Sequence, residues 1–254
     1  MDLPTPSVGW HGCEPVSARF EELDWRPTRL GEISLRRRFE PTLQADIYEA
    51  RLGDEFLMSS AFTVAEVALA DLSLALLSGE DLDVVVGGLG LGYTAHAVLR
   101  DPRVRSVRVI EALDEVIGWH RRGLLPVSEV LTSDPRCTLV EGDFFAMIAS
   151  GSRFGPDTLG RHDAILVDID HTPRHVLHPG HAGFYELPGQ RRLAGRLEPG
   201  GVYALWSDDP PDEGYIAVLE DVFASCEAHV VRFANPLTGG QAANTVYIAT
   251  VSHE

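Results

Sequence analysis

The sequence predicts an α/β fold, an open sheet that is parallel for most of its width and has helices on both faces. Two observations support it. From Asp83 onward, short runs rich in β-branched residues alternate with segments whose apolar residues recur at helical spacing. The first such run, Val84-Val-Val86, is followed by four glycines within six positions and then by a helical segment. A strand that breaks into a glycine turn and opens a helix is typical of the nucleotide-binding turn of α/β proteins.

This alternation predicts a Rossmann-like sheet of seven strands. We expect the strands at residues 83–87, 105–111, 137–141, 163–168, 201–207, 228–234 and 244–251. We expect the intervening helices near residues 94–100, 113–122, 144–149, 184–196 and 213–225. A short loop over residues 235–243 joins the last two strands, which favours an antiparallel pair at the sheet edge.

A small β module is predicted ahead of this sheet. About the first 25 residues are rich in Pro, Gly and Ser and are expected to form an irregular arm. Alternating stretches follow at residues 32–36 and 45–51, and Gly53-Asp54 is typical of a hairpin turn before residues 55–58. Residues 62–77 have helical spacing. The expected division is an arm and β-hairpin module over residues 1–60 and the nucleotide-binding domain over residues 61–254.

Composition narrows the function. The formal net charge of −17 disfavours nucleic acid and anionic membranes as partners. No apolar run approaches a membrane span and the N-terminus lacks the features of a signal peptide, so we expect a cytoplasmic protein. All 21 Lys and Arg positions are arginine, which excludes a Schiff-base lysine. Three scattered cysteines indicate neither a disulfide framework nor a zinc site.

The glycines of the turn are the first candidate binding residues: Gly87, Gly88, Gly90 and Gly92. Glycine lets the backbone approach a ligand, and the free N–H groups at a helix start point towards it. A nicotinamide dehydrogenase is disfavoured, because the third glycine of Gly88-Leu-Gly-Leu-Gly92 comes one position early for that fingerprint.

Carboxylates follow three consecutive predicted strands, at Glu111, Asp143, Asp168 and Asp170. In open parallel sheets ligands bind outside the carboxyl ends of the strands. Glu111 lies about 20 residues past the glycines, where a carboxylate can accept both ribose hydroxyls. Asp143 can accept from an adenine amino group, with Phe144 against the ring. The structural alternatives are that Asp143 caps a helix and that Glu111 favours the positive end of the next one. Together, behind the glycine turn, the set predicts a nucleoside site.

Four runs, in this order, resemble the spermidine/spermine synthases, or aminopropyltransferases, which belong to the wider class I S-adenosylmethionine-binding fold. They are Val85-Val-Gly-Gly-Leu-Gly90, Val109-Ile-Glu-Ala-Leu-Asp-Glu-Val-Ile117, Glu141-Gly-Asp-Phe144 and Asp163-Ala-Ile-Leu-Val-Asp168. Residues 183–187, 197–202 and 236–241 are also similar to that family, as is the small β module. The likeness spans roughly residues 30–251.

The resemblance implies that Glu111, followed by Ala112, binds the ribose, that Asp143 and Phe144 hold the adenine, and that the glycine turn faces the sulfur-bearing tail. It also implies that Asp168 is the catalytic carboxylate. The co-substrate would be S-adenosylmethionine or its decarboxylated form, the acceptor a small amine, and the assembly a homodimer. A neutral amine would attack the carbon next to the sulfonium in line, and no metal would be needed.

Three departures from the family concern the acceptor side. Gly90 stands where the family normally has an aspartate that contacts the amino groups of the donor tail and the acceptor. Asp170 comes two residues after Asp168, and His171 occupies the place of the family's second carboxylate. A glutamine and a tyrosine of the acceptor pocket are not evident around residues 62–66. Nucleoside binding therefore transfers, while diamine recognition and the carboxylation state of the donor stay open.

The loop after the fourth strand carries four histidines within eleven residues, at positions 171, 175, 178 and 181. Their spacing fits no structural zinc pattern. A lid with substrate-contacting histidines is favoured, with His171 as the candidate auxiliary base. An inert loop and a divalent-metal site, as in catechol-type methyltransferases, are the alternatives.

Trp206 and Asp208 follow the fifth strand at the same rim. Trp206 could wall the acceptor pocket and Asp208 could meet a cationic acceptor; the alternative is a turn whose aspartate caps the next helix.

Three functions fit the whole pattern. An aminopropyltransferase using the decarboxylated donor is favoured, because an acidic pocket suits a cationic tail. A methyltransferase using intact S-adenosylmethionine and a non-catalytic relative that keeps the nucleoside pocket are the others.

Overall fold

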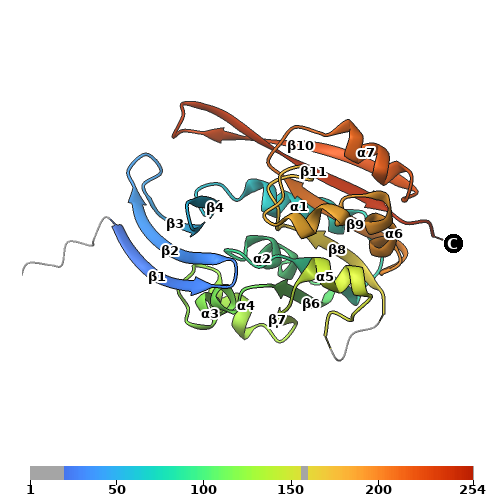
Figure 1. Ribbon diagram of the computed structural model, residues 1–254, viewed down its shortest axis with the longest axis horizontal. Coiled ribbons are helices and arrows are strands. Elements are labelled where there is room, and N and C mark those ends of the chain that lie inside the picture. Colours follow the sequence, from blue (N-terminus) through green and yellow to red (C-terminus); the bar gives the residue numbers. More distant parts are fainter. Residues whose placement is uncertain (1–19, 156–159, 254) are drawn as a thin grey trace, which may run out of the picture.

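The structure is a computed structural model that describes residues 20–155 and 160–253. Seven strands form the large sheet in the order β10-β11-β9-β8-β5-β6-β7 (Figure 1). Their bounds are β5 Leu82–Gly87, β6 Val104–Glu111, β7 Cys137–Glu141, β8 His162–Val167, β9 Leu197–Ser207, β10 Ser225–Asn235 and β11 Gly240–Thr250. The pairs from β9 to β7 are parallel, and β11 is antiparallel to both β9 and β10. The predicted fold class is confirmed.

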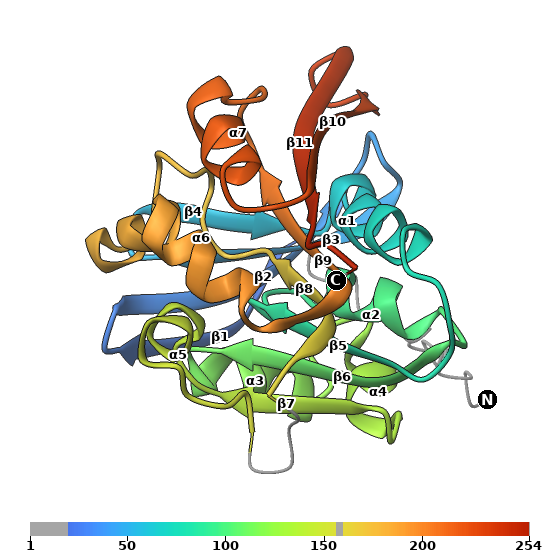
Figure 2. The same cartoon turned by 90° about the vertical axis from the view of Figure 1, so that its right-hand side faces the viewer.

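Helices cover both faces of this sheet (Figure 2). They are α1 Val64–Ala75, α2 Tyr93–Leu99, α3 Asp114–Arg121, α4 Ser128–Ser133, α5 Phe144–Ser150, α6 Leu187–Ala194 and α7 Glu213–Glu220. Helices α1 to α4 bury one hydrophobic cluster against the sheet, and α5 to α7 bury a second, largely aromatic one. In β5, Val84 and Val86 face the first cluster and Val85 faces the second, because side chains alternate along a strand. Burial on both faces explains why this strand is a continuous apolar run.

The N-terminal module is a four-stranded antiparallel sheet, larger than the expected hairpin. Its strands are β1 Phe20–Thr28, β2 Gly31–Glu40, β3 Ala45–Leu52 and β4 Glu55–Ser59. The predicted turn at Gly53-Asp54 joins β3 to β4. The prediction of an irregular arm is wrong for residues 20–25, which belong to β1; its side chains are mostly exposed, so they give no alternating pattern. The rest of the predicted arm, residues 1–19, lies outside the described residues.

Several other elements also differ from the predictions. Helix α4 was not predicted, because only Ser128 and Leu131 of its six residues are buried. The single helix expected over 184–196 is a 3₁₀ helix, η1 Pro179–Phe184, followed by α6, which has a proline in its first turn. Helix α7 ends at Glu220, short of the expected 225, because β10 begins at Ser225. Strand β9 starts at Leu197, and the β10–β11 loop shrinks to residues 236–239.

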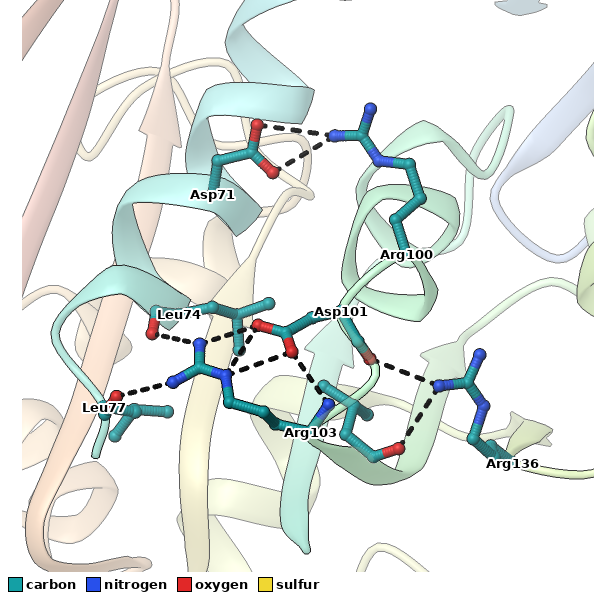
Figure 3. A network of polar contacts seen from close by, with 8 residues as sticks. Asp71, Leu74, Leu77, Arg100, Asp101, Arg103 and Arg136 are labelled. Carbon is teal, nitrogen blue, oxygen red and sulfur yellow. Dashed lines mark hydrogen bonds and ion pairs between the residues drawn. The ribbon is translucent and has the colours of Figure 1, made fainter. Parts of the chain in front are cut away.

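Arginines tie the amino-terminal ends of the sheet to the helices (Figure 3). Arg103 donates to the carbonyl oxygens of Leu74 and Leu77, at 2.9 and 2.8 Å, and pairs with Asp101 at 2.7 Å. These carbonyls lie at the C-terminal end of α1, whose last turn carries no basic residue of its own. The guanidinium therefore satisfies backbone acceptors that a helix end leaves unpaired and complements the helix dipole.

The N-terminal sheet is docked on the body by side chains of β1 and the turn after it. Trp119 of α3 donates its indole N–H to Asp24 at 2.9 Å, and Arg29 donates to the carbonyl of Ala112 at 2.7 Å. The N-terminal sheet and the tip of the β10–β11 hairpin project to the same side of the body (Figure 1). No helix in the described part of the chain combines the length and apolar composition needed to cross a bilayer.

One buried histidine predicts a pH dependence of stability. His162 is 2% exposed, its Nδ1 has no hydrogen-bond partner among the described residues, and burial, reinforced by Arg108, lowers its pKa from 6.5 to about 4. As the pH falls, His162 therefore binds a proton near pH 6.5 in the unfolded chain but only near pH 4 in the folded chain. The free energy of unfolding should fall by about 3 kcal/mol across this window as the pH falls.

Urea denaturation of the parent and of His162→Phe between pH 7 and 4 measures this effect. In His162→Phe, the free energy of unfolding should fall much less between pH 7 and 4 than in the parent. In His229→Asn, at a partly exposed site on β10, it should fall as much as in the parent. An unchanged slope in His162→Phe would show that His162 does not carry the effect.

Candidate active site

A cavity of about 590 Å³ lies at the carboxyl ends of strands β5 to β9. Strand β4 and the tip of the β10–β11 hairpin close its sides. The predicted site residues that line it are Gly88, Gly90, Gly92, Glu111, Ala112, Asp143, Phe144, Asp168, Asp170, His171, Trp206 and Asp208. Gly87 is not among the lining residues. A set drawn from five strand ends therefore shares one cavity, as ligand binding at the end of a parallel sheet requires.

The glycine turn approaches β8 more closely than any other residue type would permit. Gly88 has φ +96°, and a Cβ there would lie 2.1 Å from the carbonyl oxygen of Asp168. Gly87 ends β5, and its carbonyl oxygen accepts from the N–H of Asp168 at 2.8 Å. The ring of Phe144 lies 2.9 Å from where a Gly87 Cβ would stand. Gly87 is therefore packed beneath the residues that line the cavity and does not line it itself.

Glu111, the last residue of β6, holds the turn from the other side. Its carboxylate accepts from the N–H of Leu89 at 3.1 Å and from that of Leu113 at 2.9 Å, one on each oxygen. Burial raises the pKa of Glu111, and these backbone donors oppose the rise. A carboxylate oxygen can accept two hydrogen bonds, so each oxygen of Glu111 can also accept one from a hydroxyl on the cavity side.

His120 is a supporting residue that the sequence did not indicate. It is 1% exposed in α3, and its Nε2 lies 2.9 Å from the carbonyl oxygen of Gly90. A carbonyl only accepts, so Nε2 carries the proton and Nδ1 faces the hydroxyl of Ser128 at 3.5 Å. Burial lowers the pKa of His120, which keeps the ring neutral. The ring thereby fixes the backbone orientation of the turn at Gly90.

Gly90 faces the N-terminal sheet rather than open space. A Cβ on Gly90 would lie 2.8 Å from Sδ of Met58, a residue of β4 that also lines the cavity. Where the resemblance led us to look for an aspartate, this chain packs a thioether. The wall beside Gly90 is therefore apolar, with Phe56, Leu57 and Met58 following one another along β4.

Asp143 and Phe144 combine structural positions with places on the cavity wall. Asp143 is the N-cap of α5, where its side chain accepts from the N–H of Ala146 at 3.0 Å, so the capping alternative is confirmed. Phe144 is 2% exposed and stacks on Phe154 with ring centroids 5.7 Å apart. Its ring belongs mainly to the aromatic core, so its predicted contact with adenine would be made by an edge.

The carboxyl groups of Asp168 and Glu66 are neighbours in the wall of the cavity. Asp168 follows β8 and accepts from the hydroxyl of Thr94 at 2.7 Å. Glu66 of α1 lines the same cavity; burial and the neighbouring Asp168 raise its pKa to about 8. Burial also raises the pKa of Asp168, against the hydrogen bond from Thr94. Glu66 was not among the predicted site residues, although a glutamate on the apolar side of a helix was a signal.

The histidine loop divides into two groups. His171 lies 3.3 Å and His175 3.9 Å from the carboxylate of Glu55, the first residue of β4, so both tie the loop to the N-terminal sheet. His181 instead contacts the carboxylate of Asp170 at 2.8 Å. Within the described residues, no group of three or more His, Cys, Asp or Glu side chains has the arrangement needed to hold a metal ion.

Trp206 and Asp208 line the cavity where the C-terminal hairpin folds over it. Asp208 accepts from the side-chain amide of Asn244 on β11 at 2.8 Å. The cap of the next helix, α7, is Asp212, so the capping alternative is wrong for Asp208. The indole N–H of Trp206 is buried, with no acceptor among the residues the structure describes.

The hairpin also contributes an aromatic contact that the sequence did not indicate. Phe233 of β10 packs on Phe62, which precedes α1, with ring centroids 5.5 Å apart, and both rings line the cavity. Two segments far apart in the sequence therefore meet in the wall of the cavity.

Comparisons with known proteins agree with this geometry. No protein-family model matches the chain. It is 28% identical over 148 residues to putrescine N-methyltransferase 3 of Nicotiana tabacum and 28% identical over 164 residues to polyamine aminopropyltransferase 2 of Pseudomonas aeruginosa. These alignments cover 56% and 61% of this chain but only 34% and 43% of those proteins, so the chain spans less than half the length of either.

Solved structures extend the likeness to the whole fold. A spermidine synthase in complex with the transition-state analogue AdoDATO matches 92% of this chain and 74% of its own, with a TM-score of 0.71 and 17% identity. Spermidine synthase from Thermotoga maritima matches with a TM-score of 0.69, the same coverage of both chains and the same identity. The chain therefore has the spermidine synthase fold, and its sequence is similar to those of polyamine aminopropyltransferases and putrescine N-methyltransferases.

Proposed function

We propose that the chain is a transferase that moves an alkyl group from an S-adenosylmethionine-type donor to a small amine, with aminopropyl transfer from the decarboxylated donor favoured. The observation that carries the proposal is the meeting of Glu111, Asp143 and Asp168 on one cavity behind the glycine turn. The similarity to a polyamine aminopropyltransferase and to putrescine N-methyltransferases supports it.

The residues present fit such a donor. The free acceptor capacity of Glu111 suits two ribose hydroxyls, and the bare backbone at Gly88 lets a ligand approach the turn. The donor supplies an electrophilic carbon next to a sulfonium. Because the pocket holds donor and amine together, positioning provides much of the acceleration.

Asp168 is the proposed catalytic carboxylate. The hydroxyl of Thr94 donates to Asp168 at 2.7 Å, which favours the charged form of Asp168. Of the two neighbouring carboxyl groups, Glu66 is therefore the protonated one near neutral pH. One negative charge then remains on Asp168, in a buried place where it orients an amine and stabilises the positive charge that forms on nitrogen.

A methyltransferase using the intact donor is the second candidate, favoured by two observations. Met58 occupies the side of Gly90, so this wall offers no carboxylate to a cationic tail. Arg29, from the turn between β1 and β2, lines the cavity beside Ala112 and offers a positive charge to the carboxylate of an intact donor.

Replacement of Asp168 tests the proposed function. Asp168→Asn should lower turnover by about 10²–10⁴-fold, because a carboxylate at the reacting nitrogen is lost. Binding of methylthioadenosine should stay within about threefold of the parent, because most donor contacts survive. Calorimetry with methylthioadenosine and transfer assays with a panel of amines provide both measurements.

Asp71→Asn is the matched control, since Asp71 is an exposed residue of α1 paired with Arg100. It should keep full activity. Equal activity of Asp168→Asn and the parent would remove Asp168 from its proposed role, and a parent that binds no nucleoside would overturn the proposed function itself.

Donor choice separates the two candidates. The parent should bind the decarboxylated donor about tenfold or more tightly than the intact one, which corresponds to roughly 1.4 kcal/mol. Arg29→Gln should leave this affinity unchanged. If the intact donor binds more tightly, if Arg29→Gln weakens it, and if labelled methyl groups reach the amine, the methyltransferase is the correct function.

The buried Glu66 predicts a second pH dependence. Its pKa is raised from 4.5 to about 8, so the folded chain holds a proton that the unfolded chain releases. This contribution to the free energy of unfolding is complete below pH 4.5 and is lost as the pH rises to about 8. Glu66→Gln should therefore be more stable than the parent at pH 8.5, with little difference at pH 4.5. Urea denaturation at both values measures it, with Glu129→Gln, at an exposed site on α4, as the control.

A further inference from the structure

Asp170 has a carboxylate that is fully enclosed by the protein. Its side chain is 0% exposed and takes three hydrogen bonds. The backbone N–H of Leu177 donates at 2.8 Å, His181 Nδ1 lies at 2.8 Å, and the hydroxyl of Tyr185 donates at 2.9 Å. A carboxylate bound in this way cannot reach an acceptor amine itself. Its predicted substrate contact would have to be made through a neighbour.

His181 is that neighbour. Its Nδ1 faces an acceptor-only carboxylate, so Nδ1 carries the proton and, in the neutral ring, Nε2 holds a lone pair. The side chain is 16% exposed and lines the cavity, and Nε2 has no hydrogen-bond partner among the described residues. Nε2 is not fully buried, so its lone pair is accessible on a side chain that lines the cavity.

The ring is held in one orientation by packing as well as by its hydrogen bond. Phe145 of α5 lies against it with ring centroids 4.1 Å apart, and Phe184 packs on Phe145 at 5.0 Å. A histidine whose one nitrogen is fixed by a buried aspartate, and whose other nitrogen faces a cavity, has the arrangement that orients a general base in Asp–His dyads.

The other histidines of the loop lack this arrangement. His171 also lines the cavity, but its Nε2 lies 3.3 Å from the carboxylate of Glu55, so this nitrogen of the predicted auxiliary base already has a partner. His178 accepts the N–H of Gly180 on Nδ1 at 3.1 Å, within its own turn. His175 is 68% exposed and does not line the cavity.

We infer that His181, oriented by Asp170, is the base that takes the proton from the attacking amine. The inference rests on the proposed transfer to an amine. As the amine nitrogen bonds to the donor carbon, the carbon–sulfur bond breaks and its electron pair returns to sulfur, which becomes a neutral thioether. Before this bond forms, the acceptor ammonium releases one proton to Nε2 of His181, which leaves the nitrogen lone pair free to attack, and Asp170 stabilises the resulting imidazolium. Asp168 keeps the separate task of orienting the nitrogen.

Turnover of His181→Ala with and without imidazole tests the inference. The variant should lose about 10²–10⁴-fold in turnover, the range typical of a general base. It should bind methylthioadenosine within threefold of the parent, and imidazole should restore at least tenfold of the lost turnover, because the small base fills the space of the missing ring. Asp170→Asn should also lose turnover, because an amide can accept from Nδ1–H through its oxygen or donate to a bare Nδ1 through its NH2, and so no longer fixes the tautomer with a free Nε2.

His175→Asn is the control from the same loop and should keep the turnover of the parent. Undiminished turnover in His181→Ala, a loss that imidazole does not relieve, or a parallel loss of methylthioadenosine binding would each overturn the role of His181. A parent that binds methylthioadenosine but transfers to no amine overturns the proposed function together with this inference. If the parent transfers the alkyl group to an amine but the His181 variants do not behave as expected, only the inference about His181 is overturned and the proposed function stands.

Because Asp170 ties the loop together, a substitution could also unfold it, and a measurement on the intact chain is therefore needed. Long-range ¹⁵N–¹H NMR spectra of the parent report which nitrogen of neutral His181 carries the proton. Protonation on Nδ1 supports the inference, and protonation on Nε2 overturns it whatever the variants do.

Discussion

The close approach of β5 and β8 at their carboxyl ends is the constraint on which the site depends. Asp168 donates its N–H to Gly87, and its carbonyl oxygen occupies the space of a Gly88 side chain. The backbone of the turn and the chain after β8 are therefore in direct contact, and Thr94 of α2 can reach the Asp168 carboxylate. A side chain at Gly88 would push the glycine turn away from the chain after β8.

Local pattern and topology together predicted the sheet and the strand-end carboxylates. Strands β5 and β8 are buried on both faces, so their sequences are continuous apolar runs that are visible without a structure. The residue after such a run must lie at the rim, which is why Asp168 could be predicted from the sequence. Strand β1 and helix α4 were not predicted, because most of their side chains are exposed and their sequences show no hydrophobic periodicity.

Residues that reach the site through distant contacts could not be predicted in this way. Nothing near Gly90 indicates that Met58 fills its open side or that His120 bonds its carbonyl oxygen, because each contact depends on how separate elements pack. The same holds for Asn244, which meets Asp208 only after the C-terminal hairpin folds back. The histidines of the loop were visible in the sequence, but only the position of Asp170 distinguishes His181 from His171.

Charge distinguishes the cavity from the rest of the described chain. Elsewhere several partly buried carboxylates have arginine partners, as Asp83 has Arg105 and Asp101 has Arg103, and hydrogen bonds from these partners help to lower their pKa values. In the cavity, burial raises the pKa values of Glu66, Glu111 and Asp168, and none of the three has an arginine partner among the described residues. Unpaired buried carboxyl groups cost stability. A chain with 21 arginines that leaves these groups unpaired keeps a pocket of carboxyl groups with raised pKa values, an arrangement that clusters at functional sites.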